Sequence, residues 1–153
     1  MARPLIRRAE AGDEPWIRAC AERAYARYVP LIGKKPAPMI ADFACQIAAG
    51  QVHVALGDSG PLGFIVFYPQ GDHMLLENVA VSPEAAGQGV GGVLIAFCEA
   101  QAAGMAGVRL YTNAKMVRNL AIYPRLGYVE TGRRQEEGFD RVYFEKSFPP
   151  DPR

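Results

Sequence analysis

The sequence predicts an α/β fold in which a mixed, mostly antiparallel sheet is flanked by helices. Helix-like spacing of apolar residues dominates the first 50 residues. Three runs rich in β-branched and aromatic residues follow, separated by short turns that favour antiparallel pairing. The second half then alternates helix, strand and helix before two closing strands. This order of elements predicts an antiparallel meander followed by a βαβ-like unit and a final hairpin.

The N-terminal third is predicted to be mainly helical. A first strand over residues 5–9 precedes a helix that Asp13 can cap and that begins two residues later. On or near one face of this helix lie Trp16, Ile17, Cys20 and Tyr25. Pro30 and Gly33 are expected to end it, and a second short helix is expected over residues 39–49.

The rest of the chain supplies the other strands and two longer helices. The predicted strands are 52–56, 62–68, 73–81, 108–112, 128–132 and 141–146, and the predicted helices are 90–103 and 117–126. The turn GDSGP at 57–61 is a hairpin signal between the first two of these strands.

Length and composition favour one domain over residues 1–153, with residues 148–153 as a flexible tail. Half of the residues are apolar and the formal charge is only +1, which argues against a nucleic-acid partner. No apolar run could span a bilayer, so no membrane partner is expected. An odd number of widely spaced cysteines favours a cytoplasmic location. With two histidines and no CxxC or HExxH motif, no metal site is expected.

Four glycines cluster where a strand meets a helix, at Gly87, Gly89, Gly91 and Gly92. Ordered glycine costs about 0.5–1 kcal/mol, so a compensating contact is expected. The spacing matches the dinucleotide fingerprint GxGxxG, but Ser82–Ala86 separate it from the strand and no acid follows at the required distance. A flexible connector would not need four glycines. A cradle of free helix N–H groups for a pyrophosphate explains the cluster best.

Residues 86–91, AGQGVG, resemble the acetyl-CoA signature Gln/Arg-x-x-Gly-x-Gly/Ala of the GCN5-related N-acetyltransferase (GNAT) family. Ala86 departs from the first position of that signature, where a side chain is then not available to help. A second block, NLAIYPRLGYVETGRR at 119–134, resembles the downstream block of the family through Asn119, Tyr123, Gly127 and Tyr128. The resemblance covers roughly residues 5–148.

The resemblance implies acetyl-CoA as co-substrate, bound in a cleft between splayed central strands. It assigns the pyrophosphate to the backbone amides of Gln88, Gly89, Val90, Gly91 and Gly92. It also assigns the pantetheine arm to Val79 and Val81, with Asn119 bonding the same arm or, alternatively, capping a helix. The N–H of Val79 would stabilise the oxyanion.

The resemblance further implies direct attack of an amine on the thioester, with Tyr123 as the acid that protonates the leaving thiolate. The alternative for Tyr123 is a packed core tyrosine. Strand alternation places His73, Leu75, Glu77, Val79 and Val81 on one face, so Glu77 is the candidate base. A carboxylate among leucines and valines is partly desolvated, which suits that role. Its alternative is an ion pair with an arginine, and His73 is the less favoured base.

The acceptor is expected to be a primary amine of a small molecule or peptide, chosen by residues 26–39 and 135–143. Acids at Glu136, Glu137 and Asp140 would favour a cationic amine. A homodimer is also compatible with the sequence. The rival function is a non-catalytic, CoA-binding regulatory module, and the presence of Tyr123 together with Asn119 and Glu77 argues against it.

Overall fold

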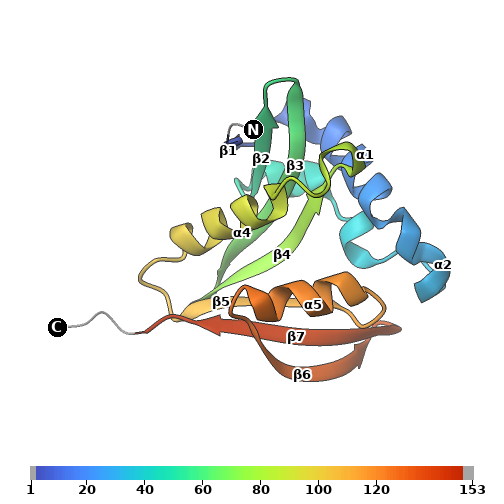
Figure 1. The fold of residues 1–153 in the computed structure, drawn as a ribbon, viewed down its shortest axis with the longest axis vertical. Helices are drawn as coiled ribbons and strands as arrows, with labels where there is room; N and C mark the ends of the chain where they lie inside the picture. Colours follow the sequence, from blue (N-terminus) through green and yellow to red (C-terminus); the bar gives the residue numbers. More distant parts are fainter. Residues whose placement is uncertain (1–2, 150–153) are drawn as a thin grey trace.

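The computed structural model describes residues 3–149, which form one seven-stranded sheet in the order β1-β2-β3-β4-β5-β7-β6 (Figure 1). Every neighbouring pair is antiparallel except β4 and β5. The strands are β1 (Leu5–Arg8), β2 (Val52–Gly57), β3 (Gly60–Gln70), β4 (His73–Val81), β5 (Gly107–Asn113), β6 (Val129–Glu136) and β7 (Phe139–Ser147). The mixed, mostly antiparallel sheet predicted from the sequence is confirmed.

Helices cover both faces of this sheet. The α-helices are α1 (Glu14–Tyr25), α2 (Val29–Ile32), α3 (Phe43–Ala48), α4 (Val90–Gln101) and α5 (Val117–Arg125). Short 3-10 helices are η1 (Ala11–Asp13), η2 (Ala26–Tyr28), η3 (Ala37–Met39) and η4 (Pro83–Ala85). One core packs α4 and α5 against the sheet, and a second core packs α1 and α3 against the opposite face. Because side chains alternate along β3, this strand contributes to both cores. Phe64 and Val66 face α1, whereas Ile65 and Phe67 face α4.

Three local predictions in the N-terminal third are wrong. Asp13 does not cap α1 through its side chain, because its carboxylate accepts the Glu10 N–H at 2.7 Å and binds Arg7 at 2.8 Å. Pro30 does not break a helix but lies in the first turn of α2, where its missing N–H costs nothing. The helix expected over residues 39–49 is divided into η3 and the shorter α3, which Asp42 caps through the Cys45 N–H.

A β-bulge in the middle of β4 changes which side chains share a face. Val66 pairs with Asn78 but Phe67 pairs with Leu76, so Glu77 is the additional residue. Leu76 and Val79, three residues apart, consequently pack in the same core. Strict alternation counted back from Val79 would have put Glu77 on that side and Leu76 on the other. The predicted common face of Glu77 and Val79 is therefore wrong: Glu77 turns toward α3, where it contacts Gln46.

The strands β4 and β5 separate after a short parallel contact. Their register has three residue pairs and ends with Leu75 opposite Arg109. Beyond that point β4 pairs only with β3, and β5 only with β7. Figure 1 shows the two strands diverging from their common end, with the start of α4 close to the far end of β4. This divergence is the splayed pair of central strands that the resemblance implied.

The C-terminal end of β7 is followed by Phe148, whose N–H donates to Ala106 O at 2.9 Å and whose ring packs against the α4 core. The remainder of the predicted tail, residues 150–153, lies outside the described residues. Within residues 3–149, none of the helices combines the length and apolar character that crossing a membrane requires.

Candidate functional site

A cavity of about 330 Å³ occupies the gap between β4 and β5. Its walls come from both sheet faces, from the segment around η3, and from α5 and β7. Eighteen residues line it: Tyr25, Pro36, Ala37, Pro38, Ala41, Gln46, Leu76, Glu77, Val79, Leu110, Tyr111, Thr112, Asn113, Met116, Asn119, Tyr123, Phe139 and Arg141. The cavity therefore brings together four of the residues singled out in the sequence, Glu77, Val79, Asn119 and Tyr123.

The peptide groups of Val79 and Val81 face this gap. Ser82 N donates to Leu62 O of β3 at 2.8 Å, and these two residues lie opposite one another in the antiparallel register. Because N–H and C=O of one residue point to the same side of a strand, every second residue back from Ser82 also faces β3, and the valines between face away. The Val79 carbonyl accepts the Tyr25 hydroxyl at 3.1 Å, which agrees with this orientation.

The glycine-rich segment forms an open turn at the start of α4. Gly87 and Gly89 both have φ = +80°, a left-handed conformation that side chains disfavour. Gly89 is the N-cap of α4 and no side chain caps that end. Open space surrounds Gly87, Gly89 and Gly92, where an added Cβ would meet no atom within 4 Å. The segment can thus present free N–H groups and the positive end of the helix dipole to a large anion.

The other residues of the glycine turn differ in their exposure. Gln88 is exposed, Val90 is buried in the α4 core, and Gly91 lies beside the side chain of Val81. Although Ser82–Ala86 separate the two segments in the chain, the Gly91–Val81 contact places the start of α4 beside the free edge of β4. A pyrophosphate at the helix and an extended arm along Val79 and Val81 would fit this continuous surface.

Tyr123 lies in α5 with its side chain in the cavity wall. The residue is 6% exposed, and its ring packs against Tyr128 and Phe144 at centroid distances of 5.7 Å. Burial raises the pKa of its phenol, so it remains protonated near neutral pH. Among residues 3–149 no group accepts a hydrogen bond from its hydroxyl. The ring packs in the core, as the alternative prediction for Tyr123 stated, whereas the hydroxyl is free to bind a ligand.

Asn119 lies in the first turn of α5 and ties this helix to β5. Its Nδ2 donates to Thr112 Oγ1 at 3.1 Å and contacts Met116 Sδ at 3.6 Å. The N-cap of α5 is Met116, so the alternative of Asn119 as the cap is wrong. Its amide lines the cavity on the side of Tyr123.

Glu77 contributes the carboxylate of the cavity. Tyr68 OH donates to its Oε1 at 2.8 Å, and Gln46 Nε2 donates to Oε2. The partners are therefore a phenol and an amide, not the arginine that the alternative reading required. Gln46 Oε1 is buried and has no hydrogen-bond partner among the described residues.

His73, the less favoured base, lies away from the cavity. It is buried at the start of β4, where Nδ1 contacts Asp72 at 2.6 Å and Nε2 lies 3.5 Å from Glu145. Although His73 follows a turn, it is shielded from solvent where β4 pairs with β5. Within residues 3–149 no three His, Cys, Asp or Glu side chains gather to hold a metal ion.

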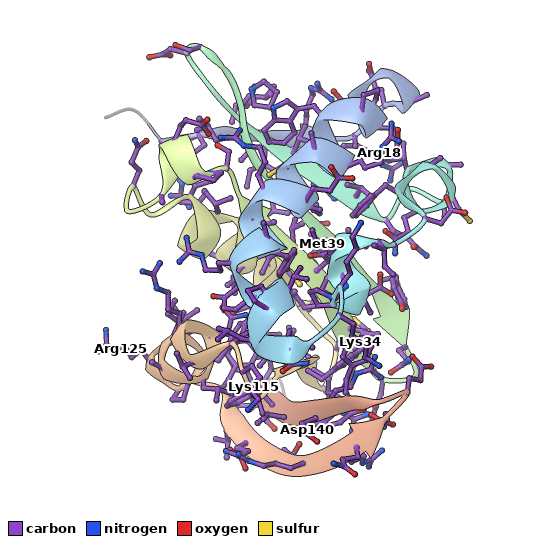
Figure 2. All side chains as sticks on the ribbon, turned by 90° about the vertical axis from the view of Figure 1, so that its right-hand side faces the viewer. Arg18, Lys34, Met39, Lys115, Arg125 and Asp140 are labelled. Atoms are coloured by element: carbon purple, nitrogen blue, oxygen red, sulfur yellow. The ribbon has the colours of Figure 1, made fainter. Side chains whose placement is uncertain are left out.

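Sequence reasoning missed several residues of the acceptor side. Of the 135–143 hairpin, Phe139 and Arg141 line the cavity, whereas the acids named in the sequence do not. Tyr111 also lies there, under the guanidinium of Arg141 at 4.5 Å from the ring centroid. Alternation along β7, with Val142 in the core, could have placed Arg141 on the open face. Figure 2 shows how the Lys34 loop and the β6–β7 hairpin approach one another at this end, where Lys34 Nζ donates to Glu137 O at 3.0 Å.

Comparison with known proteins places the chain in one family. Residues 48–130 match the family model described as an acetyltransferase (GNAT) domain. Among solved structures, PaiA N-acetyltransferase from Thermoplasma acidophilum in complex with coenzyme A aligns with a TM-score of 0.76 at 17% identity, over 97% of this chain and 100% of that one. The ribosomal-protein-S18-alanine N-acetyltransferase from Escherichia coli aligns with a TM-score of 0.74 at 20% identity, over 94% and 93%.

A third structure, nourseothricin acetyltransferase, aligns with a TM-score of 0.60 at 25% identity over 64% of this chain. The alignment spans 65% of that protein, just under two thirds of its length. Among curated proteins, comparison by sequence finds no match.

Proposed function

Since the chain belongs to the GNAT acetyltransferase family, we propose that it moves an acetyl group from acetyl-CoA directly to a primary amine of a small molecule or peptide. The observation that carries this proposal is the open N-terminus of α4, whose Gly91 lies beside Val81 on β4, two residues from Val79 in the wall of a cavity that also holds Tyr123 and Glu77. Coenzyme A in the Thermoplasma acidophilum structure supports the choice of donor.

Acetyl-CoA would be held mainly by backbone. The N–H groups of Gln88, Gly89, Val90, Gly91 and Gly92 would receive the pyrophosphate. Val79 and Val81 would bind the pantetheine arm as an added strand would, and Asn119 would bond it from the other side. Acetyl-CoA supplies the activated thioester carbonyl. The Val79 N–H, aimed into the gap, would stabilise negative charge on that carbonyl oxygen.

Two side chains would move protons. Glu77 would accept a proton from the amine, directly or through water, because its carboxylate lies in the cavity wall with two donors fixing its position. As the carbon–sulfur bond breaks, Tyr123 would give its hydroxyl proton to the departing thiolate. Burial keeps the phenol protonated, so the proton is present when the thiolate forms, and the phenolate left behind would recover a proton from water.

A non-catalytic CoA-binding module is the rival. It would need the glycine turn but neither an unpaired phenol nor an oriented carboxylate in the cavity. Both groups are present, and the Tyr123 hydroxyl donates no hydrogen bond to the described part of the chain. These two observations favour catalysis.

The test combines acetyl-CoA, the purified chain and a panel of amines and peptides, with mass spectrometry to detect acetylated product. We expect Glu77→Gln to lower turnover by about 100-fold or more, the usual share of general base catalysis, while calorimetry shows unchanged acetyl-CoA affinity. Glu14→Gln is the control, because Glu14 pairs with Arg18 on α1 outside the cavity. Tight acetyl-CoA binding without any acetylated product would favour the rival module.

A further inference from the structure

The acceptor end of the cavity carries one positive and one negative side chain. Glu77 reaches it from β4 and Arg141 from β7, and Tyr111 of β5 lies between these strands in the sheet order. Burial raises the pKa of the Tyr111 phenol, which lies close enough to both charges for Arg141 to lower that pKa and Glu77 to raise it. A ligand that bridged the two groups would lie across the Tyr111 ring.

Arg141 is well placed to receive an anion. Its side chain is only 11% exposed, and its guanidinium lies over the rings of Tyr111 and Phe139 at 4.5 and 5.5 Å from their centroids. A guanidinium that stacks on an aromatic ring keeps the N–H groups in its own plane free to donate. Two parallel N–H groups of this kind can bind the two oxygens of a carboxylate. Within the described residues no oxygen accepts a hydrogen bond from this side chain.

The acids near Arg141 do not satisfy it. Glu136 and Glu137 approach no closer than 3.8 and 3.6 Å, beyond hydrogen-bond distance. Glu136 accepts the Tyr143 hydroxyl instead, and the Glu137 side chain is 78% exposed. A mostly buried guanidinium without a hydrogen-bonded partner is costly, and a bound carboxylate would remove that cost.

The opposite side of the cavity offers acceptors for an amine. Beside the Glu77 carboxylate, Gln46 Oε1 is buried without a partner. An amine nitrogen bonded to both would lie on the wall facing Arg141.

We propose that the acceptor is an amino-carboxylate, either a free amino acid or an ω-amino acid, whose carboxylate binds Arg141 while its amine lies at Glu77 and Gln46. This proposal rests on the acetyl-transfer function proposed above and narrows its substrate. It also replaces the purely cationic amine expected from the hairpin acids, which lie outside the cavity wall.

The experiment compares acceptors in pairs that differ only at the carboxylate. Leucine, phenylalanine, lysine and 5-aminopentanoate are each measured against the corresponding carboxamide, with acetyl-CoA as donor. We expect each accepted acid to exceed its amide in kcat/KM by about 10- to 100-fold, the contribution of a charge-assisted hydrogen bond. Arg141→Gln should abolish that difference by raising KM for the acid while leaving kcat and the amide unchanged.

Arg134→Gln is the matched control. Arg134 also lies over a tyrosine of the same hairpin, 4.9 Å from the Tyr143 centroid, but does not line the cavity. Amides or simple amines that serve as well as the acids, or an equal loss on both in Arg141→Gln, would overturn the amino-carboxylate proposal and leave acetyl transfer intact. A chain that acetylates neither class would remove the proposed function, and this inference with it.

Discussion

The proposed binding of pyrophosphate by the glycine turn can be tested with a substitution that adds one methyl group. Gly89→Ala adds a Cβ where the backbone is left-handed at φ = +80° and where no protein atom lies within 4 Å. An L-residue in that conformation costs about 1–2 kcal/mol, partly offset because alanine is less flexible than glycine in the unfolded chain. We therefore expect the free energy of unfolding to fall by about 1 kcal/mol, or about 2–4 °C in Tm for a chain of this size.

The effect on acetyl-CoA should be larger than the effect on stability. If the turn keeps its shape, the methyl occupies the space proposed for the pyrophosphate, and if the turn relaxes, the N–H groups lose their common direction. Either result removes at least one hydrogen bond to a charged oxygen, worth about 1.5–3 kcal/mol. Calorimetric titration should show an increase in Kd of about 10- to 100-fold.

Gly104→Ala separates strain from ligand contact. Gly104 has φ = +88°, is equally exposed and also has no atom within 4 Å of an added Cβ. It follows the opposite end of α4, about 18 Å away at 1.5 Å per residue. The two variants should lose similar stability, and only Gly89→Ala should bind acetyl-CoA weakly. Equal affinity of the wild type and Gly89→Ala for acetyl-CoA would refute pyrophosphate binding by the glycine turn.

Three further outcomes follow from the burial of single side chains. Tyr123→Phe should lower kcat by about 100-fold with little change in acetyl-CoA affinity or Tm, because the ring contacts remain and the lost hydroxyl has no partner in the described chain; full activity would remove it from the mechanism. Burial lowers the pKa of His53 below its usual 6.5, so the unfolded chain binds this proton more readily. Stability should therefore fall as pH drops below 6.5, and denaturation of His53→Leu across pH 5–7 should show a shallower slope. Burial raises the pKa of the Cys20 and Cys98 thiols to about 12, whereas Cys45 is exposed. A thiol reagent should then label Cys45 alone in the native protein, and Cys45→Ser should prevent labelling.

Local patterns predict most of this fold because each strand and helix carries its own signal. The β4 run is bounded by turns, and its predicted limits at 73–81 match the structure. The glycine turn could be predicted for the same reason, since the positive φ of Gly87 and Gly89 favours glycine at those positions. The errors around Asp13 and Pro30 arose where two neighbouring turns compete for one side chain or one proline, which spacing alone does not resolve.

The acceptor side could not be predicted because it is assembled from distant segments. Gln46 meets Glu77 only after α3 packs beside β4, and Arg141 meets Tyr111 only through the β5–β7 register. Neither contact leaves a periodic trace in the sequence. The sequence does contain the arginine, but its role depends on which face of β7 is open.

The bulge at Glu77 gives the site a property that a regular strand would lack. In strict alternation Glu77 would share the α4 face with Val79, on the same side of the sheet as Tyr123. The extra residue turns the carboxylate to the α3 face, while Tyr123 stays with the α4 and α5 core. The proposed proton acceptor and proton donor then approach the gap from opposite faces of the sheet. In direct transfer the amine adds to the carbonyl carbon to give a tetrahedral intermediate, from which the thiolate leaves. Separate faces would let Glu77 take the amine proton while Tyr123 protonates the thiolate, so that neither side chain blocks the other.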